Sequence, residues 1–139
     1  MLSQAYYHIA NKVKQKYPDA VFYAVSRWKF RYITAEEWNN TYIWSKELAP
    51  SVELLNDYKD SKKTKSDWDL YKLRYLEEMN NTSAKETMLK IAREAALNSV
   101  FLFCHCGPEE GKQCHRFLLL DMINDVAKEA GVNVEILGR

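Results

Sequence analysis

The chain has 139 residues, enough for one domain of ordinary size and too few for two. Hydrophobic residues make up 47% of it and its formal net charge is +1, so a normal core can form and bulk attraction to DNA or acidic membranes is not expected. It has no apolar run near the ~20 residues that cross a bilayer, and its first residues lack a signal-peptide pattern. The three cysteines, an odd number, argue against a disulfide framework. We therefore expect a cytoplasmic protein without a membrane partner.

Apolar periodicity, turn residues and helix caps predict the elements of the chain. Residues 2–17 carry apolar side chains at helical spacing, and the run 20–25 is apolar and rich in β-formers. Capping boxes at 34–37 and 83–86 mark two helix starts. The predicted strands cover 20–25, 42–44, 100–103 and 132–137. The predicted helices cover 2–17, 34 through Trp38, 50–58 and 67–80, and a further helix begins at 83 and ends before 98. A last helix precedes Gly131, which is its predicted C-terminal cap.

Strands that alternate with helices predict an α/β fold, with a small, mostly parallel sheet and helices on both of its faces. We expect this three-layer arrangement to form a single domain over residues 1–139. In such sheets, ligands bind beyond the carboxyl ends of the strands, where the strand order reverses. The strand over 20–25 leads to Arg27 and Arg31, and the strand over 100–103 leads to a loop with cysteine and histidine. These two segments are therefore expected to meet in one site.

The segment 104–116 contains all three cysteines and two of the three histidines, between a predicted strand and the last predicted helix. Its glycines allow tight turns that present backbone amides. Residues 114–116 fall in the first turn of the helix, where free amides and the helix dipole favour an anion. We therefore hypothesise that a small phosphate- or carboxylate-bearing molecule binds here. The candidate ligand-binding residues are Arg27, Arg31, Gly107, Gly111, Lys112 and Arg116.

A cysteine in such electropositive surroundings is also a candidate nucleophile, because the thiolate form is favoured there. The candidate catalytic residues are Cys106 and Cys114, either of which can supply the thiolate, and His115 as the acid–base partner. The first hypothesis is therefore an anion-binding protein that acts as an enzyme or as a sensor, through thiolate chemistry at this loop.

Two other interpretations of the loop compete with this one. The soft ligands that it offers to a zinc ion are Cys104, Cys106, Cys114 and His115 or His105. An extended Cys-x-Cys segment points its two thiols to opposite faces, so this metal site requires a bend of the chain at His105. Alternatively, the loop carries no site at all, and Cys104 simply ends the buried strand as a small hydrophobic residue.

The segment 59–65 holds four lysines. A phosphate-contacting patch and a solvated loop are both compatible with this run, and a solvated loop is the commoner case for so short a stretch. A further hypothesis is the binding of nucleic acid through Lys62, Lys63, Lys65 and exposed aromatic residues. The near-neutral net charge of the chain disfavours it.

The pattern Cys106-x7-Cys114-His-Arg, after an apolar strand and before a helix, resembles the signature of the domain of unknown function 488 family. The segment Lys46-Glu-Leu-Ala-Pro-Ser51, followed by Trp68, Tyr71 and Tyr75, is similar to the family branch that carries a Lys-Glu-Leu-Ala-Pro-Ser segment. The spacing of Arg27 and Arg31 also matches this branch, and the likeness covers roughly residues 20–125. Cys104 and His105 are additions to the usual pattern. The resemblance implies a small cytosolic α/β domain and no particular activity.

Overall fold

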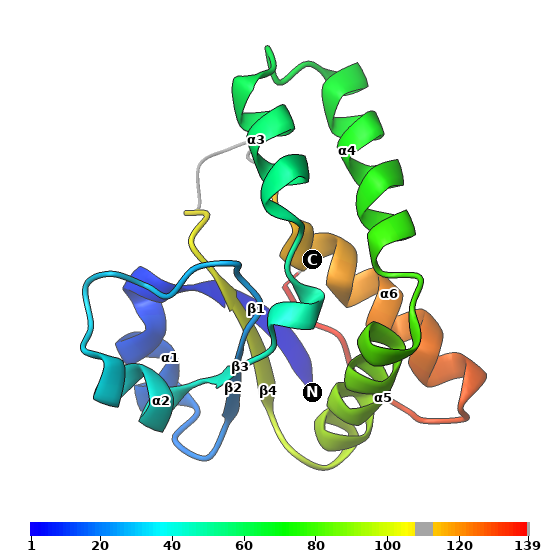
Figure 1. The fold of residues 1–139 in the computed structure, drawn as a ribbon. Helices are drawn as coiled ribbons and strands as arrows, with labels where there is room; N and C mark the ends of the chain where they lie inside the picture. The colour runs from blue at the N-terminus through cyan, green and yellow to red at the C-terminus, as the bar shows by residue number, and fades with distance from the viewer. Residues whose placement is uncertain (108–112, 139) are drawn as a thin grey trace.

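The computed structural model describes residues 1–107 and 113–138. Within them, the chain forms an α/β fold around a parallel sheet with the strand order β1-β4-β2-β3 (Figure 1). The strands are β1 (Leu2–Tyr6), β2 (Val21–Ala24), β3 (Ile43–Trp44) and β4 (Val100–Cys104). The helices are α1 (Ala10–Lys16), α2 (Ala35–Thr41), α3 (Val52–Asp60), α4 (Lys65–Glu78), α5 (Thr82–Leu97) and α6 (His115–Glu129). The predicted α/β fold is confirmed.

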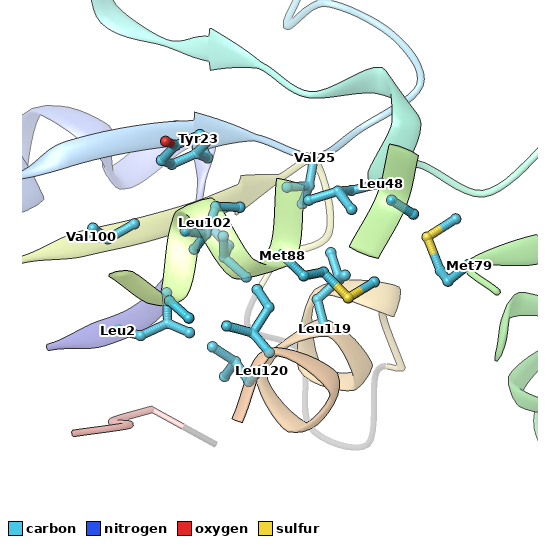
Figure 2. Close-up of a cluster of buried hydrophobic side chains, with 14 of the residues drawn as sticks. Leu2, Tyr23, Val25, Leu48, Met79, Met88, Val100, Leu102, Leu119 and Leu120 are labelled. Carbon is cyan, nitrogen blue, oxygen red and sulfur yellow. The ribbon is translucent and has the colours of Figure 1, made fainter. Parts of the chain in front are cut away.

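Helices cover both faces of the sheet, because each strand presents alternate side chains to its two sides. On β4, Val100 and Leu102 face one hydrophobic cluster, whereas Phe101 and Phe103 face the other. The first cluster packs against α5 and α6 (Figure 2), and the second, which is rich in aromatic rings, packs against α1 and α2. With both faces covered, the carboxyl ends of the strands are the place where polar side chains can gather around a ligand.

The first residues form a strand, so the predicted helix over 2–17 is wrong at its start. β1 pairs in parallel with β4 from Leu2 to Tyr6, and α1 begins only at Ala10, after a short 3-10 turn. Leu2 and Ala5 are buried on opposite faces of the sheet. The apolar positions of so short a segment fit either period, and pairing with β4 overrides the helical spacing.

The predicted strand over 132–137 is reduced to a single parallel bridge between Ile136 and Leu2. The backbone of Leu2 donates to the carbonyl of Glu135 and accepts from the amide of Leu137, each at 2.8 Å. The alternating apolar residues of this segment are half-buried against the first cluster. Their alternation therefore reflects packing beside β1 and not a continuous ladder of hydrogen bonds.

Helix caps account for several element boundaries. Thr34 caps α2, as predicted. The predicted cap at Ser83 is wrong, because Asn81 caps α5 and its side chain accepts a hydrogen bond from the amide of Ala84. Gly131 follows α6 with a φ of 70°, the left-handed conformation predicted for it. Among the helices that the structure describes, none combines the length and apolarity that a bilayer crossing requires.

Candidate functional site

The candidate site lies where the chain leaves the two central strands. β2 and β4 are hydrogen-bonded neighbours at the centre of the sheet. After β2 the chain runs to the edge strand β3, whereas after β4 it runs through α6 to the other edge, at β1, so the two connections leave in opposite directions. A crevice between the carboxyl ends of two such strands is where α/β sheets bind ligands. His105, just after β4, places Nε2 2.9 Å from the carbonyl oxygen of Trp28, just after β2. The two segments therefore meet, as the sequence predicts.

All three cysteines come together at this crevice. Cys104 ends β4, the chain bends at His105, and Cys114 is the N-cap residue of α6. The sulfur atoms of Cys104, Cys106 and Cys114 lie within 4.8 Å of one another, and all three are free thiols. The bend brings the thiols of Cys104 and Cys106 together, which an extended segment would not do. His105 itself is exposed.

A backbone carbonyl just after β2 holds the ring of His115 in one orientation. Its Nε2 lies 2.7 Å from the carbonyl oxygen of Val25, and its Nδ1 lies 3.7 Å from the sulfur of Cys114. A carbonyl oxygen only accepts, so Nε2 carries a hydrogen and Nδ1 of the neutral ring is left to accept from the thiol. A nucleophile beside a base that a third group orients is the arrangement of catalytic Cys–His pairs.

The thiol cluster favours the ionised form of Cys114 over that of its two neighbours. Hydrogen bonds from Cys104 and then from Cys106 hold the pKa of the Cys114 thiol well below its usual value, against the effect of burial. Hydrogen bonds to Cys106 and Cys114, together with burial, raise the pKa of Cys104 well above its usual value. The hydrogen bond with Cys104 lowers the pKa of Cys106, but the one with Cys114 and burial outweigh it and raise this pKa to about 11. Of the three, Cys114 is therefore the thiol that ionises most readily.

A cleft of about 1020 Å³ lies beside the cysteine cluster. Residues that follow β2 and β4, and the start of α6, line it on the side of the sheet. On the other side it is lined by α3 and α4, which stand next to each other beyond the sheet (Figure 1). This wall carries the rings of Tyr58, Trp68 and Tyr71, and Trp28 lines the cleft from the β2 side. The cysteines thus lie at one end of an aromatic cleft.

Positive charge gathers around this cleft. The basic side chains that line it are Arg27, Lys59, Lys63 and Lys65, with His105 and His115. Among the described residues that line it, none is an aspartate or a glutamate, although the chain as a whole has 19 acidic residues against 20 lysines and arginines. Lys65 forms an ion pair with Asp69 at 3.2 Å, and Asp69 itself does not line the cleft. The imbalance is local, and such a cleft attracts anions.

The predicted ligand-binding arginines divide between three places. Arg27 lines the cleft. Arg31 is exposed, donates to the hydroxyl of Tyr32, and does not line the cleft. Arg116 is buried behind the loop, where Nε donates to Gln4 and Nη1 donates to the carbonyl of Cys106, at 2.6 and 2.8 Å. The structure therefore does not bring Arg31 and Arg116 to the cleft with Arg27.

The glycines and the lysine of the predicted site complete this account. Gly107 directly follows the cysteine pair, and a Cβ added to it would meet nothing within 4 Å, so the space beside its backbone is open. Gly111 and Lys112 lie outside the described residues. From the predicted sites, the cleft thus unites Arg27 with Cys104, Cys106, Cys114 and His115.

The segment 46–51, which resembles the family branch, is fixed beside the cleft by three side chains. Arg27 donates to two of its carbonyls, each at 3.1 Å. Tyr75 donates its hydroxyl to a third carbonyl at 2.6 Å. Glu78 accepts from the amide and the hydroxyl of Ser51, at 2.8 and 2.5 Å. Arg27 and Tyr75, two residues that carry the resemblance, therefore help to join α3 and α4 to the sheet.

Sequence reasoning missed the aromatic wall and gave little weight to the lysines. Trp68 and Tyr71 lie on one helix face, and this spacing predicts a core stripe. The structure half-exposes Trp68 in the cleft. The run of lysines over 59–65 beside that aromatic stripe is the feature of the sequence that could have indicated the wall.

A family model described as the active DUF488-N3 subclade (DUF488-N3a) matches residues 8–127, which is most of the chain. The matched range includes β2, β4, the cysteine cluster and the segment 46–51. Comparisons with curated proteins and with solved structures gave no match. The resemblance predicted from the sequence to the domain of unknown function 488 family is confirmed.

Proposed function

The chain belongs to the domain of unknown function 488 family, and from this premise we propose that it binds a small anionic molecule in the cleft and acts on it through Cys114. One observation carries the proposal: the cleft that ends at the thiol cluster is lined by three lysines and one arginine, and none of its described lining residues is a carboxylate. The description of the matching subclade as active agrees with a reaction at this site. Three free thiols at the site suit a reducing compartment such as the cytoplasm.

In this proposal each group at the floor of the cleft has a separate role. Cys114 is the nucleophile, and its place at the N-cap of α6 adds the favourable field of a helix N-terminus. Nδ1 of His115 takes up the thiol proton and returns it. Cys104 and Cys106 act as hydrogen-bond donors to the thiolate. Arg27 and the lysines of the wall attract the anionic ligand.

The proposal predicts that the reactive thiol prefers an anionic reagent. The ratio of alkylation rates with iodoacetate and iodoacetamide, measured on Cys114 by peptide mass spectrometry, should exceed the ratio for glutathione by about tenfold and fall with added salt. The double variant Lys59→Gln/Lys63→Asn should reduce the preference, and asparagine suits the φ of 55° at position 63.

The matched control is Lys12→Gln/Lys14→Gln on α1, two exposed lysines that do not line the cleft. It removes the same charge and should keep the preference. A ratio equal to that of glutathione, or an equal loss in both double variants, would remove the support for anion binding at the cleft.

A specific observation favours a second candidate function, a metal centre on the three thiols. Sulfur atoms bound to one tetrahedral zinc at ~2.3 Å lie about 3.8 Å apart. The sulfur atoms here, within 4.8 Å of one another, would need to close by about 1 Å at most. Among the described residues this group of ligand atoms consists of the three thiols alone, so they would leave a fourth position for a ligand or water, as in catalytic zinc sites.

The metal candidate predicts about one zinc per chain in protein purified without tag or chelator, measured by elemental analysis. Cys104→Ser should lose the metal, because the buried thiol at the end of β4 would be one of three ligands. Zinc added to the reduced protein should also block alkylation of Cys114. A wild-type protein that neither retains nor takes up zinc, and whose Cys114 alkylates at the same rate with zinc present, would rule this candidate out.

A further inference from the structure

The cleft is larger than a single inorganic anion requires. Its volume of about 1020 Å³ corresponds to the upper end of the ~300–1,000 Å³ found for clefts that enclose whole small molecules. The lysines 59, 63 and 65 stand at the end of α3, in the turn and at the start of α4, whereas the thiols stand beside the sheet. Between these two polar regions, rings and aliphatic side chains line the cleft. A ligand that fills it must therefore offer an apolar part as well as charge.

The apolar part of the cleft is built from aromatic rings. Tyr58, Trp68 and Tyr71 form one ring cluster, with centroids 4.9 to 5.7 Å apart, and Trp68 stacks on Tyr71 with an interplanar angle of 16°. Trp28 is 60% exposed, and its contacts with Ser26 and His105 are made by its backbone carbonyl. Exposed indole rings in a cleft are platforms on which flat rings stack.

The charge around the rings favours a ligand with more than one negative charge. Lys59, Lys63 and Arg27 line the cleft, and no described lining residue neutralises them. A single carboxylate would balance only one of these cations, whereas a phosphate monoester carries close to two charges at neutral pH. Phosphate is also the anion that several lysines together bind well.

A flat ring joined to a phosphate is the chemistry of a nucleotide. We propose that the ligand of this cleft is a nucleoside monophosphate, with its base on the Trp28 and Trp68 rings and its phosphate at Lys59 and Lys63. This inference rests on the proposed function, because it names the ligand class of the same cleft. The near-neutral net charge of +1 favours a single nucleotide over a long nucleic acid, which requires an extended basic surface.

The test uses the full chain, tryptophan fluorescence and equilibrium dialysis. Adenosine and guanosine 5′-monophosphates should bind and quench the fluorescence, while adenosine and ribose 5-phosphate, each with half of the ligand's features, should bind at least about tenfold more weakly. Trp28→Ala should weaken the binding of adenosine 5′-monophosphate by about tenfold. The matched control is Tyr32→Ala, which removes a ring of similar exposure, 63%, that does not line the cleft.

The outcomes separate this inference from the function on which it rests. If Trp28→Ala loses nucleotide binding while Tyr32→Ala keeps it, the nucleotide assignment is supported. If the nucleotides bind no better than inorganic phosphate while Cys114 of the wild-type chain still prefers iodoacetate, the assignment is wrong and anion binding stands. If the preference is also absent, both fail. Binding of a single-stranded oligonucleotide much more tightly than of the mononucleotides, with a steep salt dependence, also overturns the assignment.

Discussion

Iodoacetamide should alkylate Cys114 down to a pH well below about 8.5, the pKa of an ordinary thiol. Hydrogen bonds from Cys104 and then from Cys106 lower the pKa of Cys114, so its thiolate persists as the pH falls. Because only the thiolate reacts, the midpoint of the rate-against-pH curve moves to lower pH with the pKa. The midpoint is the quantity to measure, by peptide mass spectrometry, because Cys114 is only 4% exposed and its absolute rate also depends on access.

Two variants of Cys106 test the cause of this shift. Cys106→Ala removes one hydrogen-bond donor to the thiolate and should move the midpoint for Cys114 toward that of an ordinary thiol. Cys106→Ser keeps a donor at the same position and should leave the midpoint low. In the wild type, Cys106 itself should become reactive only at alkaline pH, since its pKa is raised to about 11. Identical profiles for the two variants, or a wild-type midpoint equal to that of free cysteine, would contradict the role of the thiol hydrogen bonds.

The place of the site could be predicted because it depends on the sheet alone. Two apolar runs, 20–25 and 100–103, predict adjacent parallel strands, and polar residues that follow such strands must collect at one edge. The bend of the backbone at His105 could not be predicted from the sequence. It decides whether Cys104 and Cys106 face the same way, and it is accompanied by a contact between His105 and the backbone of Trp28, which is far away in the chain.

The cleft wall could not be predicted, because one helix face serves two purposes. Trp68, Tyr71 and Tyr75 recur at intervals that place them on a single face of α4. At one end of this face, Tyr75 is fully buried and its ring lies 5.5 Å from that of His115. At the other end, Trp68 lines the cleft. Periodicity identifies the face but not the point at which α4 passes beyond the sheet and the core gives way to a binding surface.

The role of Arg116 also depends on distant contacts. As the first-turn residue after Cys114 and His115, it is a reasonable anion clamp on local grounds. In the folded chain its guanidinium is turned the other way, toward Gln4 on β1 and the carbonyl of Cys106. Neither partner can be inferred from sequence spacing. Since both bonds join separate elements to the start of α6, Arg116 fixes the loop that carries the thiols.

Arg116→Lys should therefore lower the free energy of unfolding by about 2 to 4 kcal/mol, measured by urea denaturation. Arg116 is 3% exposed and donates to two acceptors that lie in different elements. Lysine keeps the buried charge but lacks the planar fork, so one charge-assisted hydrogen bond is lost and one buried acceptor is left without its donor. The described residues provide no carboxylate within 4 Å of Arg116 to compensate for this loss.

The matched control is Arg74→Lys, which alters an exposed ion pair with Asp57 and should change stability by less than about 1 kcal/mol. The two interpretations of Arg116 then give opposite results. If it anchors the loop, Arg116→Lys loses stability, and the protein that remains folded keeps the preference of Cys114 for iodoacetate, because Arg116 does not line the cleft. If Arg116 is instead an anion clamp, the variant keeps its stability and loses that preference. The buried bonds to Gln4 and Cys106 favour the first result.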